Sequence, residues 1–168
     1  TKDWPDQFEE IDGRSFTFLD DLADAIVSAG VTSITGGVVA DESRYDTLRV
    51  GPWAERLVAQ NQIGPLSAAS VNEGFETWGD NLSSRVQAEN PALNTAARLS
   101  ALLVERGVEV GASASVGVAP PSPIAIAAVS SPSLKEIVTH TNSYSSNFGA
   151  EMLLKEIAYN ERGIGATD

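Results

Sequence analysis

The chain contains no cysteine, and its only histidine is His140. The absence of cysteine excludes disulfides and thiolate chemistry, and it suits a reducing cytosol as well as many exported bacterial proteins. With one histidine and no cysteine, the usual ligands of a zinc site are missing, so we expect no metal or other cofactor. A triad of serine, histidine and aspartate is open only through His140, and a solitary histidine near a helix end is more often structural or exposed.

Positive charge is also scarce, because the 168 residues carry a formal net charge of -12 and include only three lysines. Without a run of Lys or Arg, the sequence disfavours nucleic acid and anionic membrane surfaces as partners. It lacks an apolar run of about 20 residues, so it predicts no transmembrane segment, and we expect any export signal to lie outside this chain. The hydrophobic content of 42% is typical of a soluble globular fold with one core or two small cores.

Two stretches of the chain show the same order of helix, glycine and strand. In the first, apolar residues at helical spacing predict a helix over 17–29, with Thr17 and Asp20 as a capping box. Gly30 is the expected stop of this helix, and the apolar, β-rich residues 31–40 predict a strand directly after it.

The same order returns after Asn90, which is suited to cap a second helix with Pro91 at its first position. This helix is expected to end at Gly107 and to lead into a strand over 108–118. One such echo is weak evidence for an internal duplication, since helix, glycine and strand is a common way to build an α/β unit. It still favours an α/β organisation.

Two further strand candidates, 66–71 and 124–129, complete an expected fold of the α/β (α+β) class. We expect a small mixed sheet of about four or five strands with two long helices, followed by a helical hairpin. The hairpin begins with a helix that Ser131 caps and that ends near His140. A second helix runs from about Asn147 to Tyr159, and within it Glu151 and Lys155 have the spacing of an ion pair. The expected parts are a lead-in over 1–16, an α/β domain over 17–130 and a helical unit over 131–168.

Ser145, Ser146 and Asn147 lie between the two helices of this hairpin. Serine acyl transfer needs a nucleophile, a base, a route for the proton to the departing amine, and donors for the developing oxyanion. The Ser145 hydroxyl can both accept and donate, so it is suited to the proton relay, and the Asn147 carboxamide can bind a substrate carbonyl or a neighbouring lysine. The N-terminus of the following helix adds partial positive charge. The bare triplet, however, is more often only a helix cap.

The sequence around the triplet carries more information. Residues 137–155 resemble, along their whole length, the second active-site motif of the D-alanyl-D-alanine carboxypeptidases of the class C penicillin-binding proteins. Ser146 stands where the commoner form of that motif has Asp. Further blocks similar to the family follow in the same order along the chain: 22–43, 45–46, 51–53, 64–68, 71–72, 90–108 and 127–134. The linker over 72–89 is shorter than in longer members, so the chain resembles the compact, actinobacterial-like form.

This resemblance implies a serine peptidase built on the motifs S-x-x-K, S-x-N and K-T-G, with Ser145 as proton relay and Asn147 as substrate-orienting amide. The first and third motifs are absent from this sequence, because Pro132 and Met152 stand three residues before Lys135 and Lys155, and no lysine opens a K-T-G. We therefore expect a central fragment that is inactive by itself.

The parent protein is expected to act outside the cytoplasmic membrane, as a periplasmic or secreted cell-wall enzyme. Its substrates would be peptidoglycan stem peptides that end in D-Ala-D-Ala, and β-lactams would acylate the full-length protein. The alternative is a non-catalytic α/β module of a cell-envelope protein, which docks a partner or the cell-wall polymer and in which S-x-N is a relic or a cap.

The resemblance also implies that the helical unit normally packs against a transpeptidase sheet. Its apolar side would then be exposed in this chain, and we expect mobility or a homodimer through the face of 131–160. The side chains expected on that face are Leu134, Ile137, Phe148, Met152 and Ile157.

Overall fold

The structure is a computed structural model, and it describes residues 17–78 and 81–167. The predicted lead-in over 1–16 lies outside the described residues. Helices and short strands follow one another, which confirms the predicted α/β (α+β) class. In chain order the elements are α2 (Leu19–Ser28), β1 (Ser33–Ile34), β2 (Val39–Ala40), α3 (Glu55–Ala59), η1 (Asn72–Gly74), β3 (Phe75–Thr77), η2 (Leu82–Ser84), β4 (Val86–Gln87), α4 (Pro91–Glu105), β5 (Glu109–Val110), β6 (Ser115–Val116), α5 (Leu134–Tyr144) and α6 (Asn147–Arg162).

A parallel two-stranded ribbon forms the centre of the α/β part. β1 pairs with β5, and β2 pairs with β6, both in parallel. The bond from the Ala112 amide to the Gly36 carbonyl oxygen, at 2.9 Å, continues the ladder between these two pairs. The stretches 31–40 and 108–118 therefore lie side by side as successive parts of one ribbon. β3 and β4 form a separate antiparallel pair, so the strands are divided among two-stranded sheets and do not form a single sheet of four or five.

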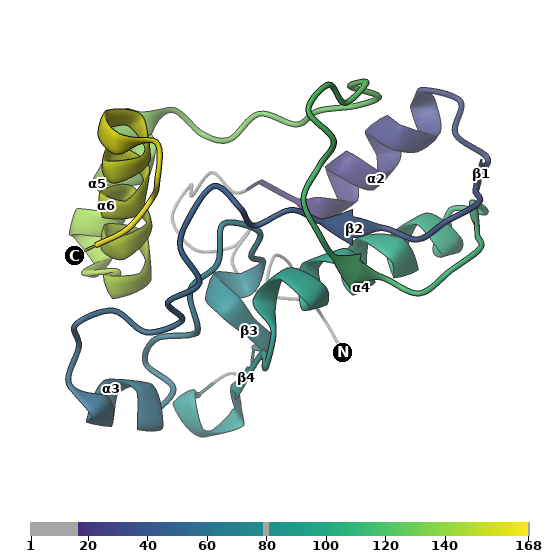
Figure 1. Ribbon diagram of the computed structural model, residues 1–168. Coiled ribbons are helices and arrows are strands. Elements are labelled where there is room, and N and C mark those ends of the chain that lie inside the picture. Colours follow the sequence, from purple (N-terminus) through teal and green to yellow (C-terminus); the bar gives the residue numbers. More distant parts are fainter. Residues whose placement is uncertain (1–16, 79–80, 168) are drawn as a thin grey trace.

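Helices α2 and α4 cover one side of the ribbon (Figure 1). Ala23 of α2, Leu103 of α4 and Val108 at the start of the ribbon are almost completely buried against one another. A second cluster of small residues, Ala40, Ala92 and Ala96, lets α4 approach the end of β2 closely. The ribbon's other side is more open, since Val39 is 55% exposed.

The predicted helix stops are confirmed, because Gly30 and Gly107 follow α2 and α4 with φ of +89° and +84°. Asn90 caps α4 as predicted, its side chain accepting from the Leu93 amide, and Pro91 is the first helical residue. The predicted capping box of α2 is wrong. The helix begins two residues later than expected, so Phe18 takes the cap position and no side chain caps it.

The strand predicted over 66–71 does not form, because its backbone is used elsewhere. The Leu66 amide donates to the Arg49 carbonyl oxygen, and the Arg49 guanidinium donates to the Leu66 carbonyl oxygen. Residues 124–129 are not a strand either. Ile124 is 89% exposed, and the prolines of 120–123 lack the amide hydrogens that a ladder needs.

Helices α5 and α6 lie together at one end of the molecule, joined to the ribbon by an extended connection (Figure 1). The cap of α5 is Ser133 and not the predicted Ser131, because Ser133 and Glu136 complete a capping box. The helix also continues past His140 to Tyr144. On the expected apolar face, Leu134 and Ile157 are exposed by 66% and 56%, while Ile137, Phe148 and Met152 are only partly exposed.

The ribbon depends on a glycine that lets its two backbones approach. A Cβ atom at Gly37 would collide with the Ser113 carbonyl oxygen, whereas a Cβ at Gly36 would meet nothing within 4 Å. We therefore expect Gly37→Ala to lower the free energy of unfolding by about 1–3 kcal/mol, the usual cost of overpacking. Gly36→Ala is the matched control and is expected to change little in urea denaturation. Equal effects of the two substitutions would contradict the argument.

Candidate active site

The bend between α5 and α6 holds the three residues of the S-x-N triplet. Ser145 is the C-cap of α5 and adopts the left-handed conformation with φ of +51°. Ser146 is the N-cap of α6, and its Oγ accepts from the Gly149 amide at 2.9 Å. The Ser146 amide donates to the Thr141 carbonyl oxygen at 3.0 Å, so the bend is fixed from both helices.

A glycine in the first turn of α6 brings this bend close to α5. A Cβ at Gly149 would lie 2.7 Å from Thr141 Oγ1 and 3.1 Å from Ser146 Oγ. Thr141 is buried beneath the turn. The first turn of α6 therefore approaches the Thr141 hydroxyl so closely that position 149 has room for the hydrogen of a glycine but not for a Cβ atom.

Ser145 and Asn147 are both exposed, whereas Ser146 is partly buried. The middle residue of the triplet is thus committed to the helix cap, and the outer two present a hydroxyl and a carboxamide to the outside of the bend. Their roles as proton relay and substrate-orienting amide remain predictions. His140 packs its ring against Tyr144, with the centroids 4.8 Å apart.

A turn formed by residues 41–53, between β2 and α3, lies against α6; we refer to it as the docking turn. Arg44 donates to both oxygens of Glu156, at 2.8 and 2.6 Å, and the Tyr45 hydroxyl donates to Glu156 at 2.8 Å. These hydrogen bonds, with that from Arg44 the strongest, lower the pKa of Glu156 to about 2. Burial raises the pKa of Tyr45 to about 12, and its hydrogen bond to Glu156 adds to the shift.

The same turn reaches a buried lysine on α6. Lys155 is only 1% exposed, and its Nζ donates to Asp46 Oδ1 at 2.7 Å. The Asp46 amide donates to the Gly165 carbonyl oxygen at 2.9 Å, which also ties the turn to the segment after α6. The predicted ion pair between Glu151 and Lys155 is wrong, because Lys155 pairs with Asp46 and both α6 residues are buried.

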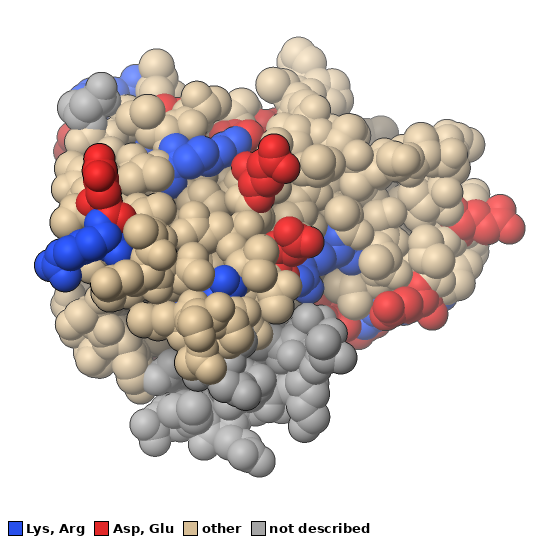
Figure 2. Space-filling model, turned by 90° about the horizontal axis from the view of Figure 1, so that it is seen from below, with Lys and Arg blue, Asp and Glu red and all other residues tan. Residues whose placement is uncertain are grey.

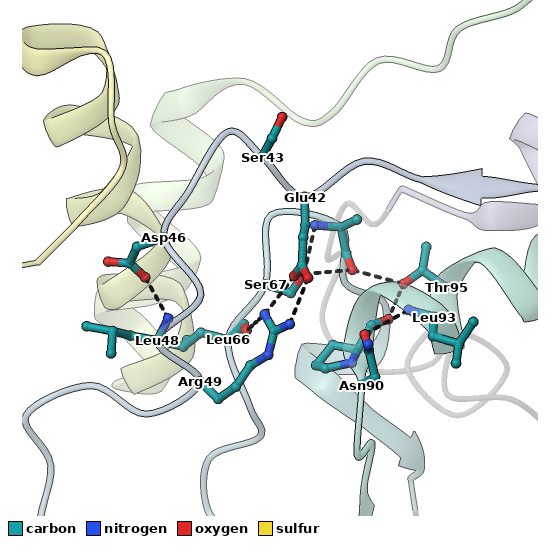
Figure 3. A network of polar contacts seen from close by, with 12 residues as sticks. Glu42, Ser43, Asp46, Leu48, Arg49, Leu66, Ser67, Asn90, Leu93 and Thr95 are labelled. Carbon is teal, nitrogen blue, oxygen red and sulfur yellow. Dashed lines mark hydrogen bonds and ion pairs between the residues drawn. The ribbon is translucent and has the colours of Figure 1, made fainter. Parts of the chain in front are cut away.

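The base of the docking turn is held by a carboxylate network (Figure 3). Arg49 donates to both oxygens of Glu42, at 2.6 and 2.7 Å, and the Ser67 hydroxyl donates to Glu42 Oε2 at 2.6 Å. The Ala69 carbonyl oxygen extends the network to Thr95 of α4. Because Arg49 binds the ionised form of Glu42, it holds the pKa of this carboxyl below its ordinary value of 4.5.

Basic side chains are interspersed with acidic ones on the face shown in Figure 2. On α4, Arg106 donates to Asp24 at 2.5 Å and to Asp20 at 2.9 Å, both from α2. Among the described residues, no helix combines the length and the apolar character that a membrane crossing requires.

Comparison with known proteins decides the family. The model of the D-Ala-D-Ala carboxypeptidase 3 (S13) family matches residues 76–167, which is more than half of the chain. The chain belongs to this serine peptidase family. The matched region contains α4, α5, α6 and the bend with Ser145 and Asn147. No curated protein matches the chain.

The docking turn lies before the region that the carboxypeptidase family model covers. Asp46 and Lys155 are 109 residues apart, so no local pattern in the sequence pairs them. A signal was nevertheless present, since Lys155 stands three residues after Met152 and seven after Phe148, on the apolar stripe of α6. A charge on such a stripe predicts a buried partner from another segment.

The cap of α6 can be tested separately from any chemistry. We expect Ser146→Ala to lower the free energy of unfolding by about 1 kcal/mol, because the Gly149 amide loses its acceptor. Ser146→Asp is expected to keep most of the stability, since Asp is an equally good N-cap residue. Ser143→Ala, at an exposed position of α5, is the control. Chemical denaturation measures the differences, and an unstable Ser146→Asp would argue against the cap.

The Glu42 network predicts a pH dependence of stability. The folded pKa of Glu42 is lowered, so its contribution is present above the ordinary value of 4.5 and is lost as the pH falls through the folded pKa. At pH 7 we expect Glu42→Gln to cost about 2 kcal/mol, and the difference from the unmodified protein to shrink toward pH 3. Glu109→Gln, which removes an exposed carboxylate, is the control in urea titrations at several pH values. A difference independent of pH would contradict this assignment.

Proposed function

We propose that this chain supplies the S-x-N wall of the acyl-enzyme site of a serine-type D-Ala-D-Ala carboxypeptidase or endopeptidase of the class C penicillin-binding type. The observation that carries the proposal is that the three residues of the bend have different environments. Ser146 caps α6, while Ser145 and Asn147 are exposed on the same bend. Membership of the carboxypeptidase family supports this reading, since the family match includes the bend.

In this site the attacking serine and its lysine would come from an S-x-x-K motif outside the 168 residues, because the sequence contains neither that motif nor K-T-G. Attack on the peptide carbonyl forms a tetrahedral intermediate, and its collapse requires a proton on the departing D-alanine amine. The Ser145 hydroxyl is suited to this step because it can accept one proton while donating another. The Asn147 carboxamide orients the substrate by donating a hydrogen bond to the substrate's carbonyl oxygen, and the N-terminus of α6 adds partial positive charge.

The proposal has consequences for organisation and partners. Residues 17–130 would be a domain inserted into the transpeptidase domain, and residues 131–168 would be the part of that domain that carries S-x-N. The chain alone would be inactive, whereas the full-length protein would be extracytoplasmic, act on peptidoglycan stem peptides and be acylated by β-lactams. The exposed Leu134 and Ile157 would be covered by the rest of the transpeptidase domain, or by a second copy when that domain is missing.

Fluorescent penicillin labelling of the full-length protein tests the proposed roles. Ser145→Ala is expected to slow acylation by about 10²-fold or more, because general acid–base contributions are of this size. Asn147→Ala is expected to slow it to a similar degree through lost substrate orientation. The control is Ser143→Ala, an exposed serine in the last turn of α5.

Two results would reject the enzyme reading. One is a full-length protein without S-x-x-K and K-T-G motifs. The other is acylation at the unmodified rate in both Ser145→Ala and Asn147→Ala. Either result would leave the non-catalytic α/β module as the better account of the chain.

A further inference from the structure

Two buried side chains of α6 and one partly buried carboxylate lie against the docking turn. Glu151, Lys155 and Glu156 all face it, one to three helical turns after Asn147. Glu156 binds Arg44 and Tyr45, and Lys155 binds Asp46. The start of α6 is thus held by the bend from α5, and its middle is held by the docking turn.

The approach of the docking turn to α6 is very close. A Cβ at Gly51 would lie 2.9 Å from Glu151 Cδ and 3.0 Å from Trp53 Cε2. At Gly165, a Cβ would lie 2.8 Å from the Lys155 carbonyl oxygen and would collide with the Tyr45 ring. The docking turn therefore packs against the Glu151 side chain at Gly51, and Tyr45 packs against the segment that folds back on α6 at Gly165. These two contacts leave little room for α6 to shift or rotate.

The charged pair of Lys155 and Asp46 lies at the centre of this contact, and stability alone does not explain its presence there. A buried ion pair pays a large desolvation cost, and well-packed apolar residues of similar size are often as stabilising. A charged pair also fixes the position of one segment relative to the other, because the ammonium must meet the carboxylate at hydrogen-bonding distance. Among the described residues, Asp46 Oδ2 and Glu151 Oε1 are buried without a hydrogen-bond partner. Lys155 therefore meets Asp46 through Oδ1 alone, which defines a single contact geometry.

Asn147 lies one helical turn before Glu151 and two turns before Lys155, within the same unbroken helix. Any sliding or rotation of α6 is therefore passed on to the bend that carries Ser145 and Asn147. We propose that Lys155, through its ion pair with Asp46, is a positioning residue that fixes the S-x-N bend relative to the rest of the active site. This inference rests on the proposed function, and it assigns to the inserted domain the task of aligning the catalytic bend.

The test uses the full-length protein with four variants: Lys155→Met, Asp46→Leu, the double variant of these two, and Arg106→Met. Arg106 pairs with α2 residues far along the chain from α6, so it controls for the general loss of an ion pair. The readouts are the acylation rate with a fluorescent penicillin, the thermal midpoint, and hydrogen exchange of the amides of residues 144–150.

We expect Lys155→Met to slow acylation by about tenfold or more, since a misplacement of about 1 Å can cost as much as 10²-fold. It should also accelerate amide exchange in residues 144–150. The double variant should regain much of the lost thermal midpoint, because both buried charges are gone, while acylation stays slow. Arg106→Met should leave acylation unchanged and lower the midpoint only slightly, because its partner carboxylates are exposed.

A double variant that recovers acylation together with its thermal midpoint would overturn the inference, because Lys155 would then serve stability alone. Acylation at the unmodified rate in Lys155→Met would overturn it as well. Should Lys155→Met fail to fold, the double variant decides instead, because it removes both buried charges together; slow acylation is again the expected result, and acylation at the unmodified rate would overturn the inference.

The failure of this inference can be told apart from the failure of the proposed function. If Ser145→Ala and Asn147→Ala label normally, the proposed function fails, and amide exchange in residues 144–150 still decides whether Lys155 holds the bend. If those two variants are slow but Lys155→Met leaves both acylation and exchange unchanged, only the positioning role fails.

Discussion

The parallel ladder between residues 31–40 and 108–117 is the constraint on which the rest of the molecule depends. β2 runs directly into the docking turn, and β6 runs into the extended segment that leads to α5. The exits of both strands are joined, because the Ala119 amide donates to Asp41 Oδ2 at 2.8 Å. The docking turn and the α5–α6 pair therefore leave the same end of one ribbon, and their meeting at α6 follows from that common origin.

The chain uses its few cations in two ways. Arg44 and Arg106 pair with carboxylates that are more than a third exposed, and such pairs contribute little to stability in water. Lys155 and Arg49 pair with more deeply buried carboxylates, because Asp46 is 18% and Glu42 is 13% exposed. In a protein with a net charge of -12, these two cations act mainly on geometry, because their directional bonds define how the docking turn sits on its neighbours.

Local signals in the sequence predicted most of the helices and where they stop. Asn90 and Pro91 start α4, Gly107 follows its end, and these features depend only on neighbouring residues. The irregular path of 66–71 was not predictable in this way, because the partner of Leu66 is Arg49 in another segment. The bend with Ser145 and Asn147 was found from its motif, whereas the Asp46–Lys155 pair joins residues too far apart for any local pattern to link.

At position 145, the left-handed backbone favours one residue type and the proposed chemistry requires another. A residue with a Cβ pays roughly 1–2 kcal/mol to adopt φ of +51°, and glycine would adopt it without this cost. Glycine, however, has no hydroxyl to offer. A redesign of this protein guided by folding stability alone would select glycine at this position and remove a group that the proposed chemistry requires.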